Sequence, residues 1–221
     1  MAVTLVKGQK INLVKPGTSG ANTSTALKSF CVGLNWGAIE IPADESSFFG
    51  IVKKAVGMTG KKVEVDLDAS CLMVDKNGKV VDFVFYGDLK SKDRAIIHSG
   101  DDLTGDMDGD DGLDNEVITV NLPKINPATE QVFFFLNSYK KQDFAEIPFA
   151  KIRMYEGTPS KVNKVFATFD VAGDSSYAGY VSMIMGKLYR RNGEWKFHAI
   201  GDPIKERDYK QTINKILKDY V

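Results

Sequence analysis

Residue types that bind zinc or form disulfides are scarce in this chain of 221 residues. It holds two cysteines, Cys31 and Cys71, which form no Cys-x-x-Cys motif, and two histidines, His98 and His198. This scarcity argues against a clustered zinc site and favours two buried thiols in a reducing compartment over a disulfide. We expect a loop hydrogen bond for His98 and an outward strand position for His198. No Ser-His-Asp or Cys-His pair indicates nucleophilic catalysis.

Long apolar runs and basic runs are also missing. No apolar stretch approaches the roughly 20 residues that a membrane-spanning helix needs. No run rich in Lys or Arg indicates a nucleic-acid partner, and the N-terminal residues lack the apolar region of a signal peptide. The sequence therefore predicts a cytoplasmic protein that binds no nucleic acid and does not insert directly into a membrane.

Acidic residues, in contrast, are concentrated in one loop, residues 99–116. The loop holds eight of the 29 acidic residues, and no Lys or Arg occurs between Arg94 and Lys124. Outside the loop, 29 basic residues stand against 21 acidic ones. This asymmetry indicates a localised cation site rather than a surface that binds polyanions.

The spacing within the acidic loop favours calcium. Two unit charges ~4 Å apart repel by ~4 kcal/mol at an effective dielectric constant of about 20, so a compact loop of this kind needs a cation. Four glycines let the backbone fold tightly, and the Asp-x-Asp-Gly-Asp pattern supplies the oxygen ligands that calcium prefers. The alternative is a solvated, disordered linker. The loop is no EF-hand, because Asp111 stands where that motif needs glycine and a strand pattern follows.

A second acidic element, Asp66-Leu67-Asp68, ends a predicted strand over Lys62–Asp68. Side chains at i and i+2 of a strand point the same way, so both carboxylates can face one ion. A polar strand terminus is the alternative interpretation. We predict that the strand end and the loop share a calcium site with these ligands: Asp66, Asp68, Asp101, Asp102, Asp106, Asp108, Asp110, Asp111 and Glu116.

The same residues permit an enzymatic alternative. A hydrophobic strand followed by Asp-x-Asp resembles the motif of haloacid dehalogenase-type phosphatases, and Asp110-Asp111 resembles their second acidic pair. This alternative is a magnesium-dependent phosphohydrolase that uses Asp66, Asp68 and the acidic loop. It requires a parallel sheet with a helix after the motif, whereas here Cys-Leu-Met-Val and an Asn-Gly hairpin follow, so we rank it second.

The remaining pattern predicts a mainly β protein. About ten short strands, Asn-Gly hairpins at Asn77-Gly78 and Asn192-Gly193, and a weak opening hairpin within residues 2–14 favour a β-sandwich of two antiparallel-rich sheets. A few short helices are expected, one over Ser47–Val56. A C-terminal helix carries an apolar stripe of Tyr209, Ile213, Ile216, Leu217 and Tyr220. We predict a sandwich domain over residues 1–203 and an amphipathic helix within 204–221.

Several segments together resemble the tellurium-resistance TerD family. The matching segments are Val32–Trp36, Asp66–Ser70, Phe85–Ser91, His98–Asp111 and Gly186–Gly201. The combination is specific, although each segment alone would be weak.

The resemblance implies a calcium-binding β-sandwich that acts in tellurite and chemical stress resistance, without enzymatic activity. It also implies a cytoplasmic protein that works with other products of a tellurium-resistance operon in a membrane-associated complex. Residues 112–115 intervene before Glu116, where the family typically closes its acidic run with Asp-Asp-Glu. The resemblance therefore leaves open whether Asp114 or Glu116 is a ligand.

Overall fold

Two six-stranded sheets form the body of the protein in a computed structural model, which describes residues 3–4, 6–15, 25–41, 61–170 and 175–221. The first sheet has the order β1 (Val3–Thr4), β14 (Lys161–Asp170), β13 (Ala150–Thr158), β5 (Ser29–Trp36), β11 (Glu116–Asn121) and β10 (Ile96–His98). The second has the order β2 (Lys10–Asn12), β16 (Glu194–Ile204), β15 (Ser182–Arg191), β12 (Gln131–Ser138), β8 (Leu67–Val74) and β9 (Val80–Val84).

Smaller elements complete the described chain. Two short ribbons pair β3 (Val14–Lys15) with β4 (Thr25–Ala26) and β6 (Ile39–Ile41) with β7 (Lys61–Val63). Two 3₁₀ turns lie at Leu122–Lys124 and Ser175–Tyr177, and one α-helix, α2, covers Tyr209–Asp219. All strand pairs in the described part are antiparallel except β1 with β14. The predicted mainly β fold with antiparallel sheets and a C-terminal helix is confirmed.

Side-chain alternation along the central strands places apolar groups on both sides of the second sheet. On β12, Phe134 belongs to the core between the two sheets, whereas Phe133 and Phe135 face α2. This explains why residues 132–136 are apolar without alternation, a pattern typical of a central strand.

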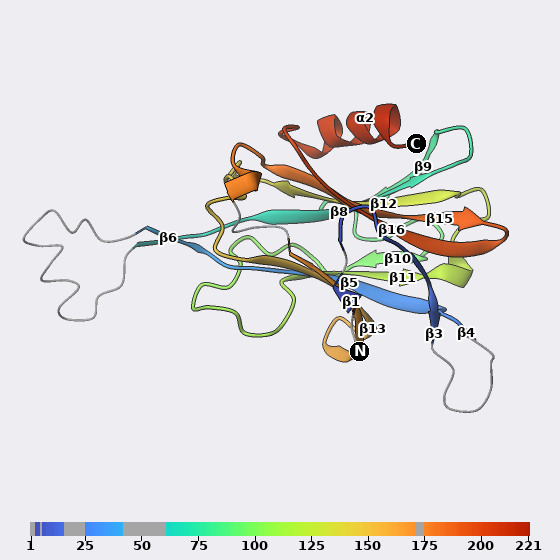
Figure 1. Cartoon of the computed structure of the whole chain (residues 1–221), viewed down its shortest axis with the longest axis horizontal. Coiled ribbons are helices and arrows are strands. Elements are labelled where there is room, and N and C mark those ends of the chain that lie inside the picture. The colour runs from blue at the N-terminus through green and yellow to red at the C-terminus, as the bar shows by residue number, and fades with distance from the viewer. Residues whose placement is uncertain (1–2, 5, 16–24, 42–60, 171–174) are drawn as a thin grey trace, which may run out of the picture.

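The helix adds a third layer, which Figure 1 shows above the second sheet. Asp208 caps its N-terminus by accepting a hydrogen bond from the Gln211 backbone N–H at 2.9 Å. All five residues of the predicted apolar stripe pack in one cluster with the outer face of the sheet, and Ile216 at its centre is fully buried. The prediction that the stripe packs on the sandwich is confirmed, whereas the domain boundary at residue 203 stays a prediction.

Two local predictions are wrong. Gly8 makes the expected turn, but β1 pairs in the first sheet and β2 in the second, so no opening hairpin forms. The expected strand over Lys62–Asp68 is broken: β7 ends at Val63 in the ribbon with β6, and β8 begins at Leu67. The chain leaves that ribbon to enter the second sheet, so Asp66 and Asp68 flank the start of a strand. The helix predicted over Ser47–Val56 lies outside the described residues.

Candidate metal centre

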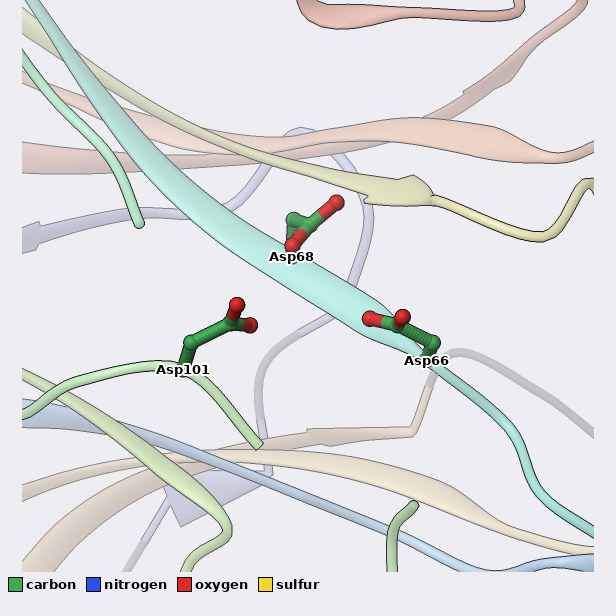
Figure 2. A group of neighbouring side chains, drawn as sticks. All are labelled: Asp66, Asp68 and Asp101. Atoms are coloured by element: carbon green, nitrogen blue, oxygen red, sulfur yellow. The ribbon is translucent and has the colours of Figure 1, made fainter. Parts of the chain in front are cut away.

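Three carboxylates from two segments meet at one end of the sandwich. Ligand oxygens of Asp66, Asp68 and Asp101 all lie within 4.8 Å of one another. Figure 2 shows Asp66 and Asp68 beside the start of β8 and Asp101 on the facing loop, with their carboxylates turned toward one another. Two of these residues are buried, Asp66 at 3% and Asp68 at 5% exposure, and Asp101 is exposed.

The surroundings compensate the negative charge of this group only in part, through Lys140 near Asp66 and Lys141 near Asp68. Among the described residues, no Lys, Arg or His nitrogen forms an ion pair with any of the three, and Asp66 Oδ1 is buried without a hydrogen-bond partner. Burial, followed by the charges of Glu116, Asp66 and Asp101, raises the pKa of Asp68 to about 8. Burial and the Asp101 charge also raise the pKa of Asp66. An orphaned buried oxygen and hard carboxylate donors fit a divalent cation such as calcium.

Glu116 lies next to this group and accepts a hydrogen bond from the backbone of β8. Strand β9 pairs with β8 only from Cys71 onward, so the backbone at Ala69 lacks a strand partner on that side. Glu116 accepts a hydrogen bond from the Ala69 N–H at 2.8 Å, and His98 Nε2 lies 3.1 Å from the Ala69 carbonyl oxygen. The Gly100 N–H donates to His98 Nδ1, which leaves the proton on Nε2 and fits a donor to Ala69. The Glu116 and His98 side chains thus bind the Ala69 backbone groups that β9 does not pair with.

The acidic loop is folded by its own carboxylates. Asp102 accepts hydrogen bonds from the N–H groups of Thr104 and Gly105, both at 2.9 Å. Burial opposes ionisation of Asp102, but these hydrogen bonds outweigh it and lower its pKa. Asp106 accepts from the Asn115 side-chain amide and from the Asp111 N–H, each at 3.1 Å. Such turns need no ion to hold them.

The loop is also fastened to the sandwich. The Asp106 N–H donates to the Trp36 carbonyl at 2.9 Å, and the Ala38 N–H donates to the Asp106 carbonyl at 3.1 Å. Gly105 has φ +67°, and a Cβ there would lie 2.4 Å from the Trp36 indole nitrogen. Only glycine suits both the backbone conformation and the close approach.

Basic residues distant in sequence neutralise the far part of the loop. Lys62 pairs with Asp108 at 3.1 Å, Lys151 with Asp110 at 3.0 Å, and Arg153 with Asp114 at 2.7 Å. The last pair is enclosed, because the Asp114 side chain is 2% exposed. Since β13 lies beside β5, its register brings Lys151 and Arg153 to the loop, which no pattern near the loop in sequence indicates.

The predicted ligand set is therefore divided. Asp66, Asp68 and Asp101 come together, and Glu116 lies beside them on Ala69. Asp102, Asp106 and Asp111 accept backbone hydrogen bonds within the loop, whereas Asp108 and Asp110 meet lysines. Calcium ligation by these residues stays a prediction.

Cys31 and Cys71 are both free and buried, as expected. No helix within the described ranges is both long and apolar enough to span a bilayer.

Comparison with known proteins gives concordant matches. The TerD domain model matches residues 1–220. Tellurium resistance protein TerZ of Serratia marcescens is 33% identical over 99% of this chain and 97% of its own length. Stress response protein SCP2 of Bacillus subtilis (strain 168) is 34% identical over 97% of this chain and 99% of its own. The crystal structure of a homologue of telluride resistance protein (TerD) from Streptomyces coelicolor A3(2) superposes with a TM-score of 0.60 at 17% identity, covering 88% of this chain and 97% of that one, and supports the fold.

Proposed function

Because this chain belongs to the TerD domain family, whose members include tellurium resistance and stress response proteins, we propose that it is a calcium-binding, non-catalytic protein of the same stress response. The observation that carries the calcium assignment is the group of Asp66, Asp68 and Asp101. A buried, unpartnered carboxylate oxygen next to two further carboxylates is costly to leave without a cation. Hard oxygen donors favour calcium, which accepts more protein carboxylates than magnesium does.

Calorimetry of chelator-stripped protein tests this proposal. We expect calcium to bind more tightly than magnesium. Asp101→Asn should weaken calcium binding by about tenfold or more, because a ligand charge is lost, and Asp101 is exposed, so the fold should tolerate the change.

Asp108→Asn is the matched control. It removes the same charge from the same loop, but the Asp108 side chain is 99% exposed and pairs with Lys62, away from the three-carboxylate group. We expect a smaller loss of affinity. Equal affinities in Asp101→Asn and the parent would refute the proposed site, and an equal loss in both variants would show that the loop attracts calcium only through its total charge.

The strand arrangement around Asp66 and Asp68 does not match the one expected for the phosphohydrolase alternative. That chemistry was expected on a parallel sheet, whereas β8 runs antiparallel to both β9 and β12. We propose that Asp66 is a calcium ligand and not a nucleophile. Metal-dependent hydrolysis of an aryl phosphate that is abolished by Asp66→Asn would reverse this choice.

A further proposal, which rests on the family resemblance alone, concerns partners and location. We propose that the protein is cytoplasmic and works in a membrane-associated complex with other tellurium-resistance proteins. Fractionation of cells tests it: the tagged chain should sediment with membranes only when those other proteins are expressed.

A further inference from the structure

The outer face of the second sheet is basic where α2 does not cover it. Lys10 on β2 lies directly opposite His198 on β16, and His198 lies directly opposite Lys187 on β15. Three neighbouring strands thus present three basic residues in one row across the sheet. The end of α2 borders this row, because the Tyr220 carbonyl accepts a hydrogen bond from Lys187 Nζ at 2.8 Å.

The row has no matching acidic partners. Side chains at directly opposed positions lie roughly 5 Å apart at Cβ, and like charges placed there are destabilising. Among the described residues, no ion pair involves Lys10 or Lys187. Asp202 on the same strand as His198 is already engaged by Lys7 at 2.6 Å and by the Tyr220 hydroxyl at 2.8 Å.

An open pocket of about 520 Å³ lies over this row. Its lining includes four lysine and arginine side chains and one histidine against a single carboxylate: Lys10, Lys76, Lys187, Arg190, His198 and Glu130. The excess of positive charge is therefore collected in a concave site.

Two of the cations are held in place. Lys187 Nζ donates to Gln131 Oε1 at 2.6 Å as well as to Tyr220, and an ammonium group has three donors, so one remains for a ligand. Arg190 Nε donates to the Thr129 carbonyl at 3.0 Å, and its guanidinium lies 4.4 Å from the centroid of the Trp195 ring. Such fixed side chains lose little entropy when a ligand binds.

Burial and neighbouring positive charge lower the pKa values of two residues in the row. Burial, and then the charge of Lys10, lowers the pKa of Lys187. Burial and the charges of Lys10 and Lys187 lower the pKa of His198, with Asp202 opposing. Beyond the effect of burial, the charge of Lys10 thus disfavours protonation of both Lys187 and His198, and a bound anion would oppose this effect.

We propose that this pocket binds a phosphate-class oxyanion, either inorganic phosphate or the phosphate group of a small ester. Lys10, Lys76 and Lys187 all line the pocket, an ammonium group can donate hydrogen bonds to a tetrahedral dianion, and lysine is a common phosphate ligand. The pocket lies at the other end of β8 from the carboxylate group, because its lining includes Lys76 beyond the end of β8, whereas Asp66 and Asp68 lie at the start of β8. We therefore expect this binding not to depend on calcium.

Proton NMR of the intact protein tests the proposal, since the chain has two histidines to resolve. Inorganic phosphate, and separately methyl phosphate, is titrated at constant ionic strength with chloride as the reference anion. Phosphate should raise the pKa of His198 and shift its ring signals in a saturable manner, while the signals of buried His98 stay in place. Tighter binding of methyl phosphate would identify an ester as the ligand, and tighter binding of inorganic phosphate would identify the free ion.

Lys10→Gln is the decisive variant because Lys10 is exposed on an edge strand and its loss should leave the fold intact. It should weaken phosphate binding by about tenfold. Lys164 is exposed on β14 of the other sheet. Lys164→Gln removes the same charge there and should leave phosphate binding unchanged. A His198 response no larger with phosphate than with chloride, or equal binding by Lys10→Gln and the parent, would overturn the proposal.

Discussion

Burial and neighbouring charges shift the pKa values of single residues in this molecule. Asp68 is buried beside Asp66 and Asp101, and the pKa of its carboxyl rises to about 8. Asp68→Asn keeps the side-chain shape and removes the charge. Without calcium we expect the variant to be more stable than the parent, by on the order of 2 kcal/mol, because the buried parent carboxyl must either take up a proton or keep a buried charge, whereas the amide is neutral. With saturating calcium the order should invert, because a ligand charge is missing.

Thermal unfolding in chelator and in calcium measures both effects of Asp68→Asn. Asp108→Asn is again the reference, since its carboxylate is exposed and paired with Lys62. Destabilisation of Asp68→Asn in both conditions would mean that the carboxylate serves the fold and not an ion.

His198 gives a prediction about pH. Burial, Lys10 and Lys187 hold its pKa below the ordinary value of 6.5. The unfolded chain then binds a proton more readily than the folded one, so this contribution to stability is complete above pH 6.5 and declines as the pH falls below it. His198→Gln removes the titrating group. Between pH 7.5 and 5.0, the parent should therefore lose more of its melting temperature than the variant, and parallel losses would contradict the assignment.

Among the elements, α2 packs on the second sheet through its apolar stripe, of which Ile216 is the fully buried member. Ile216 is 0% exposed in the cluster between the helix and β12. Ile216→Ala should destabilise the protein by about 2–4 kcal/mol, because the removed atoms leave a cavity. Asn214→Ala, on the exposed side of the same helix, is the control and should change stability little. Denaturant unfolding compares the two, and equal midpoints would mean that the helix is not part of the cooperative unit.

Elements marked by local chemistry could be predicted from the sequence. Asn192 and Gly193 both adopt positive φ, at 53° and 78°, which is what a two-residue hairpin turn requires. The periodicity of the terminal helix and the two-sided apolar character of β12 were equally local signals. The acidic loop and the Asp66-Leu67-Asp68 segment were identified for the same reason, since their charges are adjacent in sequence.

Contacts set by strand register could not be predicted in this way. Lys151 and Arg153 reach the loop because β13 lies beside β5, more than 100 residues earlier in the chain. The row of Lys10, His198 and Lys187 likewise arises from β2 and β15 flanking β16. Asp66 and Asp68 were expected at the end of a strand, and only the ribbon of β6 with β7 explains why that strand stops early.

For the whole molecule, the candidate calcium site joins the two sheets. Asp66 and Asp68 lie at the start of β8 in the second sheet, whereas Asp101 follows β10 of the first. An ion held by all three would resist separation of the sheets. We therefore expect calcium to slow amide hydrogen exchange in both β8 and β10, with α2 as the internal reference. Protection confined to residues 99–116 would show that the ion orders the loop alone.

The lengths of the outermost strands have a consequence for how this molecule meets other chains. β1, β10, β2 and β9 close the two sheets with 2, 3, 3 and 5 residues, whereas the strands between them have 6 to 11. A foreign strand adds to a sheet through a long row of unpaired backbone N–H and C=O groups. Because β1 pairs with β14 only at Ala167 and Thr168, most of β14 has no partner strand on that side among the described residues. The border of β14 is therefore the place where a strand of another chain can add to the first sheet.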